Sequence, residues 1–263
     1  MKVIVCIKQV PQTAEVKIDP QTHTLIREGV ESIINPFDMY AIEEAVRLKE
    51  KFGFKTVVLT MGPPQAEQAL REALSMGIDE AVHLSDKAFA GSDTFATSKT
   101  LSSAIKKIGD YVLILCGKQA SDGDTAQVGP GIAEWLGLPQ ICYVKRIREL
   151  NILQKYVIAE RMLEEGYEVI KTSLPALFTV VKEINQPRLP SFRDMLRAKK
   201  AQITLWTHQD LNLNPQEVGL KGSPTQVIDV FTPPPREGGK IIQALDSFEG
   251  LEEVVELLRK NKK

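Results

Sequence analysis

The sequence predicts an α/β fold in which a parallel sheet has helices on both faces, followed by an antiparallel segment and a C-terminal arm. Short apolar runs alternate with helical patterns up to about Gly137. These runs are nearly continuous in Val, Ile and Leu, which is typical of strands buried on both faces. We therefore expect parallel strands joined by helical crossovers, with the strands at residues 2–7, 55–61, 81–84 and 111–116.

Helix signals punctuate the intervals between these strands. Asn35 is placed to cap a helix, Pro36 suits its first position and Asp38 suits its first turn. Apolar residues then recur at helical spacing until Gly53, which is typical of a helix C-terminus. Three further helices are expected within residues 63–77, 93–109 and 126–137.

Two regions interrupt this alternation. Residues 16–26 predict a hairpin with a turn at Asp19-Pro20. This hairpin is an insertion after the first strand, where open α/β sheets bind their ligands. Beyond Gln140 a returning core strand is expected at 176–181. Before it, antiparallel strands are expected at 141–150, 152–161 and 167–173.

We expect one α/β domain over residues 1–205 and an extended arm over residues 206–263. A basic, helix-like stretch lies near the end of the first part, at Arg193–Lys200. Residues 211–240 are rich in Pro and Gly, which indicates an arm with little core of its own. An amphipathic helix is expected at Ser247–Lys260, docked either on a partner subunit or on the chain's own globule.

Composition and charge narrow the class of protein. The 263 residues are 43% hydrophobic and 25% charged, as in a globular protein, and the net charge of −1 argues against a nucleic-acid partner. No stretch approaches the ~18 apolar residues that a membrane span needs. Met1 leads directly into the first strand without a signal peptide, so we expect a cytoplasmic protein.

The cysteine and histidine patterns indicate neither a metal site nor a nucleophile. Cys6, Cys116 and Cys142 are far apart and form no CxxC pair, which argues against structural zinc and a disulfide framework. Cys6 and Cys116 end apolar runs, where a thiol is more often a small buried hydrophobe. The histidines, at positions 23, 83 and 208, are scattered and are expected on the surface or in loops.

One segment combines the features of a phosphate-binding loop. Gly117–Pro130 follows the run that ends at Cys116 and leads into a helix, and free amides at a helix N-terminus bind phosphate. Its small residues let a ligand approach the backbone closely, and Lys118 can neutralise a phosphate. Asp122 and Asp124 suit caps, or acceptors for ribose hydroxyls or a flavin N–H. Such a stretch is also compatible with a simple turn.

Motifs in the same order extend over nearly the whole chain. They are Met1–Val10, Asn35–Leu48, Met61–Pro64, Ala73–Gly77, Gly117–Gly129, Arg161–Thr179, Asn185–Arg188 and Arg197–Lys200. Together they resemble the electron-transfer flavoprotein β-subunit family. That resemblance implies an adenine nucleotide bound in a Rossmann-like, adenine-nucleotide-hydrolase-like domain, and an arm that reaches the α subunit.

The resemblance also implies contact residues. A hydrophobic anchor for a partner dehydrogenase falls at Phe192, flanked by Leu189 and Leu196, although ordinary packing would also explain an apolar residue there. The nucleotide contacts would be Cys6, Lys8, Asn35, Asp38, Met61, Gly117, Gln119, Asp122, Gly123, Asp124, Thr125, Ala126, Gln127, Val128 and Gly129.

The family has one type that holds AMP as a structural ligand and another that holds FAD. The AMP type shows three consecutive acids and then Asn-Gln-Thr in the loop, whereas this chain has Asp122-Gly123-Asp124 and then Thr125-Ala126-Gln127. The pattern resembles the FAD type. Glycine at position 123 removes bulk and charge, so a diphosphate can lie against the backbone.

For an FAD type, the resemblance implies a bifurcating subunit. NADH is then the hydride donor, and ferredoxin or flavodoxin takes one electron. The other electron passes through the α-subunit FAD to a flavin dehydrogenase, either acyl-CoA dehydrogenase-like or of the lactate dehydrogenase type. One alternative is an AMP-binding structural subunit. Another, from a different class, is a free-standing adenine-nucleotide-binding enzyme or stress-type module of similar fold, and a self-contained enzyme would not need the arm.

Overall fold

A computed structural model describes residues 1–12, 17–18, 25–26, 32–228 and 251–260. The chain divides into two compact units, Met1–Val230 and Phe231–Lys263. In the second unit the described residues form helix α6 (Leu251–Lys260). Positions 247–250 of the predicted C-terminal helix and the Asp19-Pro20 turn lie outside the described residues.

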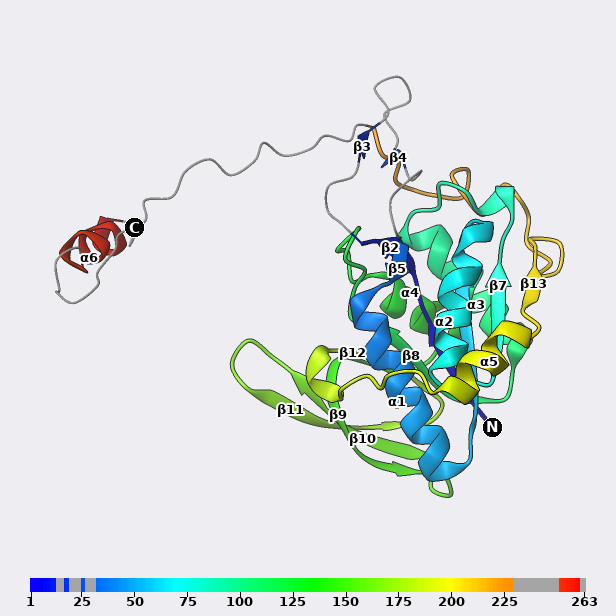
Figure 1. Cartoon of the computed structure of the whole chain (residues 1–263), viewed down its shortest axis with the longest axis horizontal. Coiled ribbons are helices and arrows are strands. Elements are labelled where there is room, and N and C mark those ends of the chain that lie inside the picture. Colours follow the sequence, from blue (N-terminus) through cyan, green and yellow to red (C-terminus); the bar gives the residue numbers. More distant parts are fainter. Residues whose placement is uncertain (13–16, 19–24, 27–31, 229–250, 261–263) are drawn as a thin grey trace. The chain divides into compact units, whose positions relative to one another are not determined.

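The first unit is built on a nine-stranded sheet among the described residues, ordered β11-β10-β9-β12-β8-β1-β6-β7-β13 (Figure 1). The strands from β9 to β13 in this order run parallel to their neighbours. The predicted parallel core is therefore confirmed. It consists of β1 (Lys2–Cys6), β6 (Lys55–Met61), β7 (Glu80–Leu84), β8 (Tyr111–Gly117), β12 (Ala176–Val180) and β13 (Thr204–Trp206).

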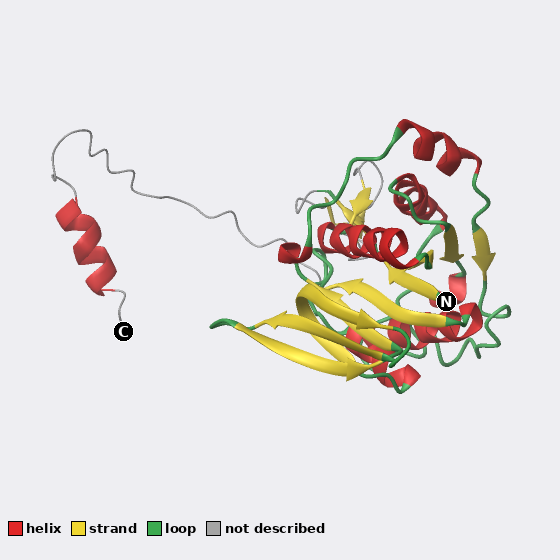
Figure 2. Ribbon diagram, turned by 90° about the horizontal axis from the view of Figure 1, so that it is seen from below, coloured by secondary structure: helices red, strands yellow, loops and turns green. Residues whose placement is uncertain are grey.

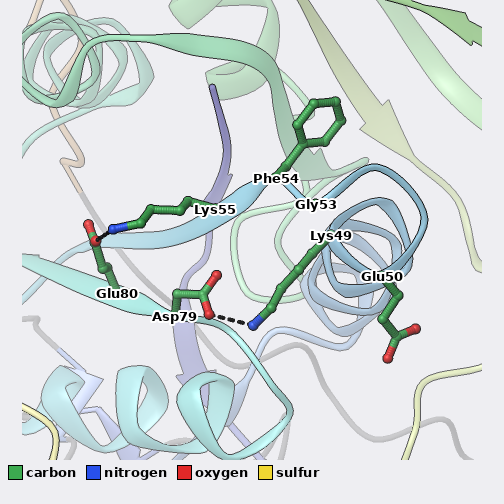
Figure 3. Close-up of a pocket in the computed structure, with 7 residues that line it drawn as sticks. All are labelled: Lys49, Glu50, Gly53, Phe54, Lys55, Asp79 and Glu80. Atoms are coloured by element: carbon green, nitrogen blue, oxygen red, sulfur yellow. Dashed lines mark hydrogen bonds and ion pairs between the residues drawn. The ribbon is translucent and has the colours of Figure 1, made fainter.

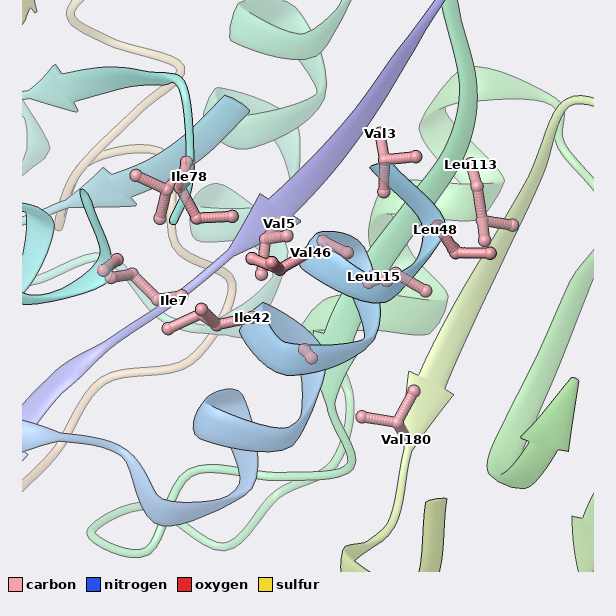
Figure 4. Close-up of a cluster of buried hydrophobic side chains, with 14 of the residues drawn as sticks. Val3, Val5, Ile7, Ile42, Val46, Leu48, Ile78, Leu113, Leu115 and Val180 are labelled. Atoms are coloured by element: carbon pink, nitrogen blue, oxygen red, sulfur yellow. The ribbon is translucent and has the colours of Figure 1, made fainter. Parts of the chain in front are cut away.

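Helices cover both faces of this sheet. The helices are α1 (Pro36–Phe52), α2 (Glu67–Ser75), α3 (Thr94–Ile108) and α4 (Val128–Leu136), and short 3-10 turns lie at Pro64–Ala66 and Lys87–Phe89. Alternate residues of each strand face opposite sides. Val3 and Val5 pack with α1 and α2 (Figure 4), whereas Ile4 packs with α3 and α4. The sheet is therefore buried on both sides, which explains its nearly continuous apolar strands.

The strand order reverses between β1 and β8. From β1 the chain moves through β6 to β7 on one side, and then returns to β8 and β12 on the other. Crossovers on the two sides of this point lie on opposite faces, so the loops after β1 and β8 diverge and leave room at the carboxyl ends of the strands. Open α/β sheets bind ligands at such a point.

An antiparallel extension continues the sheet beyond β9 (Gln140–Asn151). Strands β10 (Tyr156–Met162) and β11 (Tyr167–Ser173) pair antiparallel, as predicted, and project from the body of the unit (Figure 2). Two small pairs occupy the insertion after β1. They are β2 (Gln9–Pro11) with β5 (Ser32–Ile34), and β3 (Lys17–Ile18) with β4 (Leu25–Ile26).

The chain after β12 packs back onto this unit. A 3-10 turn at Lys182–Ile184 leads to helix α5 (Phe192–Lys200), and β13 then pairs with β7. Leu211 and Val218 are buried against the α3 face. Residues 206–222 thus pack with the first unit, although the sequence analysis groups them with the arm, because isolated apolar residues among prolines and glycines show no periodicity.

Candidate functional site

The residues singled out in the sequence converge at the carboxyl ends of β1 and β8. Cys6 ends β1, Gly117 ends β8, and Asn35 and Asp38 lie at the start of α1, which packs on both strands. Residues 118–127, called here the β8–α4 loop, connect β8 to α4. Met61 ends the next strand, β6, and is half-buried against the α3 and α4 face.

Asn35 fastens the β8–α4 loop to the start of α1. Its Nδ2 donates to the carbonyl of Gln119 at 2.8 Å, and its Oδ1 accepts from the backbone N–H of Ser121 at 3.0 Å. Asn35 occupies the predicted N-cap position, but its side chain makes no capping bond. The side-chain amide of Asn35 instead bonds to a loop that is distant in sequence, and Asn35 is buried there.

Asp38 joins the ends of β1 and β8. Its carboxylate accepts from the backbone N–H of Lys8 at 2.7 Å and from that of Gly117 at 3.1 Å. Burial raises the pKa of Asp38 to about 7, against hydrogen bonds from Lys8, Asn35 and Gly117 that lower it. A Cβ at position 117 would lie 2.3 Å from Asp38 Oδ1, so glycine is required for this contact.

The two loop acids are engaged by neighbouring side chains. Lys8 Nζ forms an ion pair with Asp122 Oδ1 at 2.7 Å, and Gln119 Nε2 donates to Asp124. The backbone N–H of Asp124 donates to the carbonyl of Ala120 at 2.9 Å. These two carboxylates therefore bind side chains of the protein and help to close the loop. Their negative charge is thus compatible with a phosphate site beside them.

The second half of the loop presents backbone N–H groups. Among the described residues, no acceptor is found for the amides of Asp122, Gly123, Thr125, Ala126, Gln127, Val128 and Gly129. The last two belong to the first turn of α4, where the helix dipole favours negative charge. Such a row of amides can bind the oxygens of a phosphate or a diphosphate.

The loop also has the space that a phosphate needs. No atom would lie within 4 Å of a Cβ at Gly123, and residues 121–125 are exposed. A Cβ at Gly129 would lie 2.7 Å from Thr179 Cγ2, so glycine lets α4 close onto β12. The Gln127 side chain accepts from the Thr94 hydroxyl at 3.0 Å and is therefore turned toward α3. The residues present fit a nucleotide phosphate.

Two buried cysteines lie beneath the loop. Cys6 and Cys116 are register partners on β1 and β8, and both are buried, as predicted. A hydrogen bond between the two thiols, together with burial, raises the pKa of Cys116 well above its ordinary value. A buried thiol with a raised pKa is a poor nucleophile, which makes Cys116 a packing residue, and both cysteines belong to the apolar cluster on the α3 and α4 face.

Some residues near the site escaped the sequence analysis. The prediction that His83 lies on the surface or in a loop is wrong, because His83 is buried in β7 with Nε2 3.2 Å from the Gly62 carbonyl. Burial lowers the pKa of His83. Its position inside an apolar run was the available signal. Thr94 and Thr179, which hold Gln127 and accommodate Gly129, carried no such signal.

Sequence comparisons identify the family. The model of the electron transfer flavoprotein domain matches residues 22–211. An electron transfer flavoprotein subunit beta from Thermoanaerobacterium thermosaccharolyticum is 54% identical over 242 residues, 92% of each chain. The caffeyl-CoA reductase-Etf complex subunit CarD from Acetobacterium woodii is 52% identical over 243 residues, again 92% of each chain. Protein FixA from Bradyrhizobium diazoefficiens is 50% identical over 238 residues, 89% of this chain and 83% of that protein. This chain belongs to the electron transfer flavoprotein β-subunit family.

A second surface of this electron transfer flavoprotein chain is apolar and exposed. Leu189, Phe192 and Leu196 are 90%, 77% and 47% exposed, and Met195 beside them is 47% exposed. Phe192, Met195 and Leu196 belong to α5 and Leu189 lies three residues before it. Ser191 caps this helix by accepting from the Asp194 N–H at 3.1 Å. We call these four residues the α5 surface. It brings together the three residues predicted to meet a partner.

A shallow hollow lies at the opposite end of the strands from the β8–α4 loop. Figure 3 shows Lys49 paired with Asp79, and Lys55 paired with Glu80 at 3.2 Å, beside the starts of β6 and β7. Because its charges already neutralise one another, the hollow offers little to a charged ligand.

No helix among the described residues of this electron transfer flavoprotein chain has the length and apolarity to cross a membrane.

Proposed function

We propose that the chain is the FAD-carrying β subunit of a bifurcating electron transfer flavoprotein and works with an α subunit. The observation that carries the proposal is the row of free amides from the β8–α4 loop into α4, which lies where the strand order reverses. Gly123 leaves the outer side of that row open, which suits a diphosphate better than a single phosphate.

The chain's part in this function is to hold and orient the cofactor. Asn35 fixes the loop to the start of α1, and Asp38 joins the ends of β1 and β8 beside it. Lys8 forms an ion pair with Asp122, and Gln119 donates to Asp124. The proposed contacts are those of the sequence analysis, from Cys6 to Gly129. FAD bound there would supply hydride acceptance from NADH and one-electron transfer to ferredoxin or flavodoxin and to the α-subunit FAD. Because the flavin itself would carry out the redox chemistry, the proposed role of the residues around the loop is to position it.

The partner proposed for the α5 surface is a flavin dehydrogenase. An exposed aromatic residue flanked by aliphatic side chains is the usual form of a hot spot that fills a partner's pocket. One relative is named as a subunit of a caffeyl-CoA reductase-Etf complex, which supports an acyl-CoA dehydrogenase-like partner over a lactate dehydrogenase type. Phe192 is the proposed anchor, with Leu189 and Leu196 around it.

The arm is proposed to dock on the α subunit. Helix α6 carries Leu251, Val254, Val255 and Leu258 on one stripe, and all four are exposed within their own unit. A chain that ends after Ile228 should keep its folded first unit and fail to co-purify with the α subunit, as tested by affinity pull-down and circular dichroism. Retention of the α subunit by this truncated chain would contradict the docking.

The nucleotide content of the purified heterodimer decides between FAD and AMP. The free amides would also bind the single phosphate of AMP, which is the alternative. Acid extraction followed by mass spectrometry should give two FAD per heterodimer. One FAD plus AMP would select the structural alternative, and an absence of any adenine nucleotide would refute both. A Gly123→Asp variant restores an acid found in the AMP type and should lower the FAD content.

A further inference from the structure

Polar contacts, more than apolar burial, hold the segment 185–201 on the protein. Among the residues of α5, only Ala198 is fully buried, and the large apolar side chains of the α5 surface point away from the core. This is the reverse of an ordinary surface helix, whose apolar stripe faces inward. The contacts that hold the segment come mainly from three guanidinium groups, those of Arg71, Arg188 and Arg197.

Arg188 ties the segment to the outer side of α1. Its Nε and Nη2 donate to the two oxygens of Glu43 at 2.8 and 3.1 Å, and its Nη1 and Nη2 donate to those of Glu50 at 2.5 and 3.0 Å. Burial favours the neutral form of Glu43, but the bonds from Arg188 and Arg47 outweigh it and lower the pKa. Three residues before Arg188, Asn185 Nδ2 donates to the Tyr40 carbonyl of α1 at 3.0 Å. Leu189 therefore follows a residue fixed by four charge-assisted bonds.

Arg71 and Arg197 cap one another's helices. Arg71, on α2, donates from Nη1 to the Ala198 carbonyl near the end of α5 at 2.9 Å. Arg197, on α5, donates from Nη2 to the carbonyls of Leu74 and Ile78 at 2.8 Å, at the end of α2. Each cation therefore adds a charged donor to carbonyls near the C-terminus of the other helix, where the helix dipole is negative. The two helices are locked together without using the outward face of α5.

We propose that Arg71, Arg188 and Arg197 are positioning residues that hold the α5 surface in its binding conformation before the dehydrogenase arrives. The inference rests on the proposed function of that surface. Binding costs free energy for every side chain and loop that must be ordered, so a surface fixed in advance binds more tightly with the same contacts. A forked guanidinium suits this task because it fixes direction as well as distance.

Titration of the purified heterodimer with an acyl-CoA dehydrogenase-type flavoenzyme from the same organism tests this inference. Arg188→Met and Arg71→Met should each raise the dissociation constant about tenfold, since the segment must then be ordered on binding. The electron-transfer rate at saturating dehydrogenase and the FAD content should stay unchanged. Arg188→Lys keeps the charge but loses the fork, and should behave like Arg188→Met. Arg193→Met is the matched control, because it removes an arginine of α5 that makes none of these contacts.

Two further measurements keep the outcomes distinct. Hydrogen exchange of residues 186–197 in the heterodimer should rise in the Arg188 and Arg71 variants and stay unchanged in Arg193→Met. Glu50→Gln, at an exposed partner of Arg188, should give a smaller rise of about threefold in the dissociation constant if Arg188→Met fails to fold. If Phe192→Ala leaves affinity unchanged, the docking function itself fails. If Phe192→Ala weakens binding while the Arg71, Arg188 and Arg193 variants bind alike, the positioning role alone is overturned.

Discussion

The β8–α4 loop and the segment that carries the α5 surface are both tied to α1, but they are held in opposite ways. Asn35 holds the loop through Gln119 and Ser121, and Asp38 holds the end of β8, where the loop begins, through Gly117. The loop leaves backbone N–H groups without an acceptor among the described residues. The segment is held by Glu43 and Glu50 further along the helix, through Arg188, and it leaves apolar side chains free.

The difference follows from what each region has to offer. A site for anionic oxygens must leave its amides unbonded, so its restraints use only a few amides and act mainly at the ends of the loop. A surface for an apolar partner must leave its apolar side chains outside, so its restraints act on the Ala198 carbonyl and through two arginines of the segment, Arg188 and Arg197. Helix α1 thus serves as a common support for both regions. A substitution in one region is therefore expected to change that region's function and leave the other's unchanged.

The largest expected effect lies at the base of the loop. Gly117→Ala would place a Cβ 2.3 Å from Asp38 Oδ1 and 2.8 Å from the Phe37 backbone, and should lower the free energy of unfolding by about 2 to 3 kcal/mol. Bound flavin should be lost with it. Gly123→Ala, in the same loop with no neighbour within 4 Å, should change stability by less than about 0.5 kcal/mol. Urea unfolding of both variants checks this, and equal stability would show that the clamp at Asp38 is unimportant.

The α5 surface should show the opposite response. Phe192→Ala should leave stability and flavin content unchanged because the ring is 77% exposed. It should raise the dissociation constant for the dehydrogenase about 30-fold, as expected for a central aromatic anchor. The measurement is a calorimetric titration, with Leu205→Ala, an exposed apolar residue of β13, as the control. A loss of stability without a change in affinity would mean that Phe192 packs within the chain and does not bind the dehydrogenase.

Structure that depends on residues close together in the chain could be predicted from the sequence. The four predicted core strands up to β8 and the helices α1, α3 and α4 lie within two residues of their predicted bounds, because continuous apolar runs, Pro36, Asp93 and the glycines after helices act on their neighbours. The loop was found for the same reason. The short strands β2 and β5 were not predicted, and α2 begins four residues after Pro63, behind a 3-10 turn. The contacts that hold the loop were not predicted. The bond between Asn35 and Gln119, for example, joins residues 84 positions apart and leaves no periodic pattern in the sequence. The packing of Leu211 and Val218, single apolar residues in a polar stretch, was missed for the same cause.

The pH dependence of stability probes the loop region alone. The folded-state pKa of Asp38 is raised from 3.8 to about 7, so the folded protein holds more protons than the unfolded chain between those values. Its contribution is complete below pH 3.8 and is lost as pH rises from there to about 7, with a slope on the order of 1 kcal/mol per pH unit between these values. Asp38→Asn should abolish that slope while keeping one acceptor oxygen. The check is the difference in urea unfolding between the two proteins from pH 5 to pH 8, and identical curves would rule out a buried, protonated Asp38.

The smallest expected effect lies at the start of α5. Ser191→Ala removes the cap that accepts from the Asp194 N–H, which is worth about 1 kcal/mol to the first turn. Because Arg71 and Arg197 hold the other end of α5, the loss should remain local. Hydrogen exchange should rise at residues 192–195, and the dissociation constant for the dehydrogenase should rise only about twofold. Ser173→Ala, on the exposed strand β11, is the control. Faster exchange through the whole of residues 192–200 would mean that the arginines do not hold α5 independently of its cap, and the contrast between the two regions would then lose its physical basis.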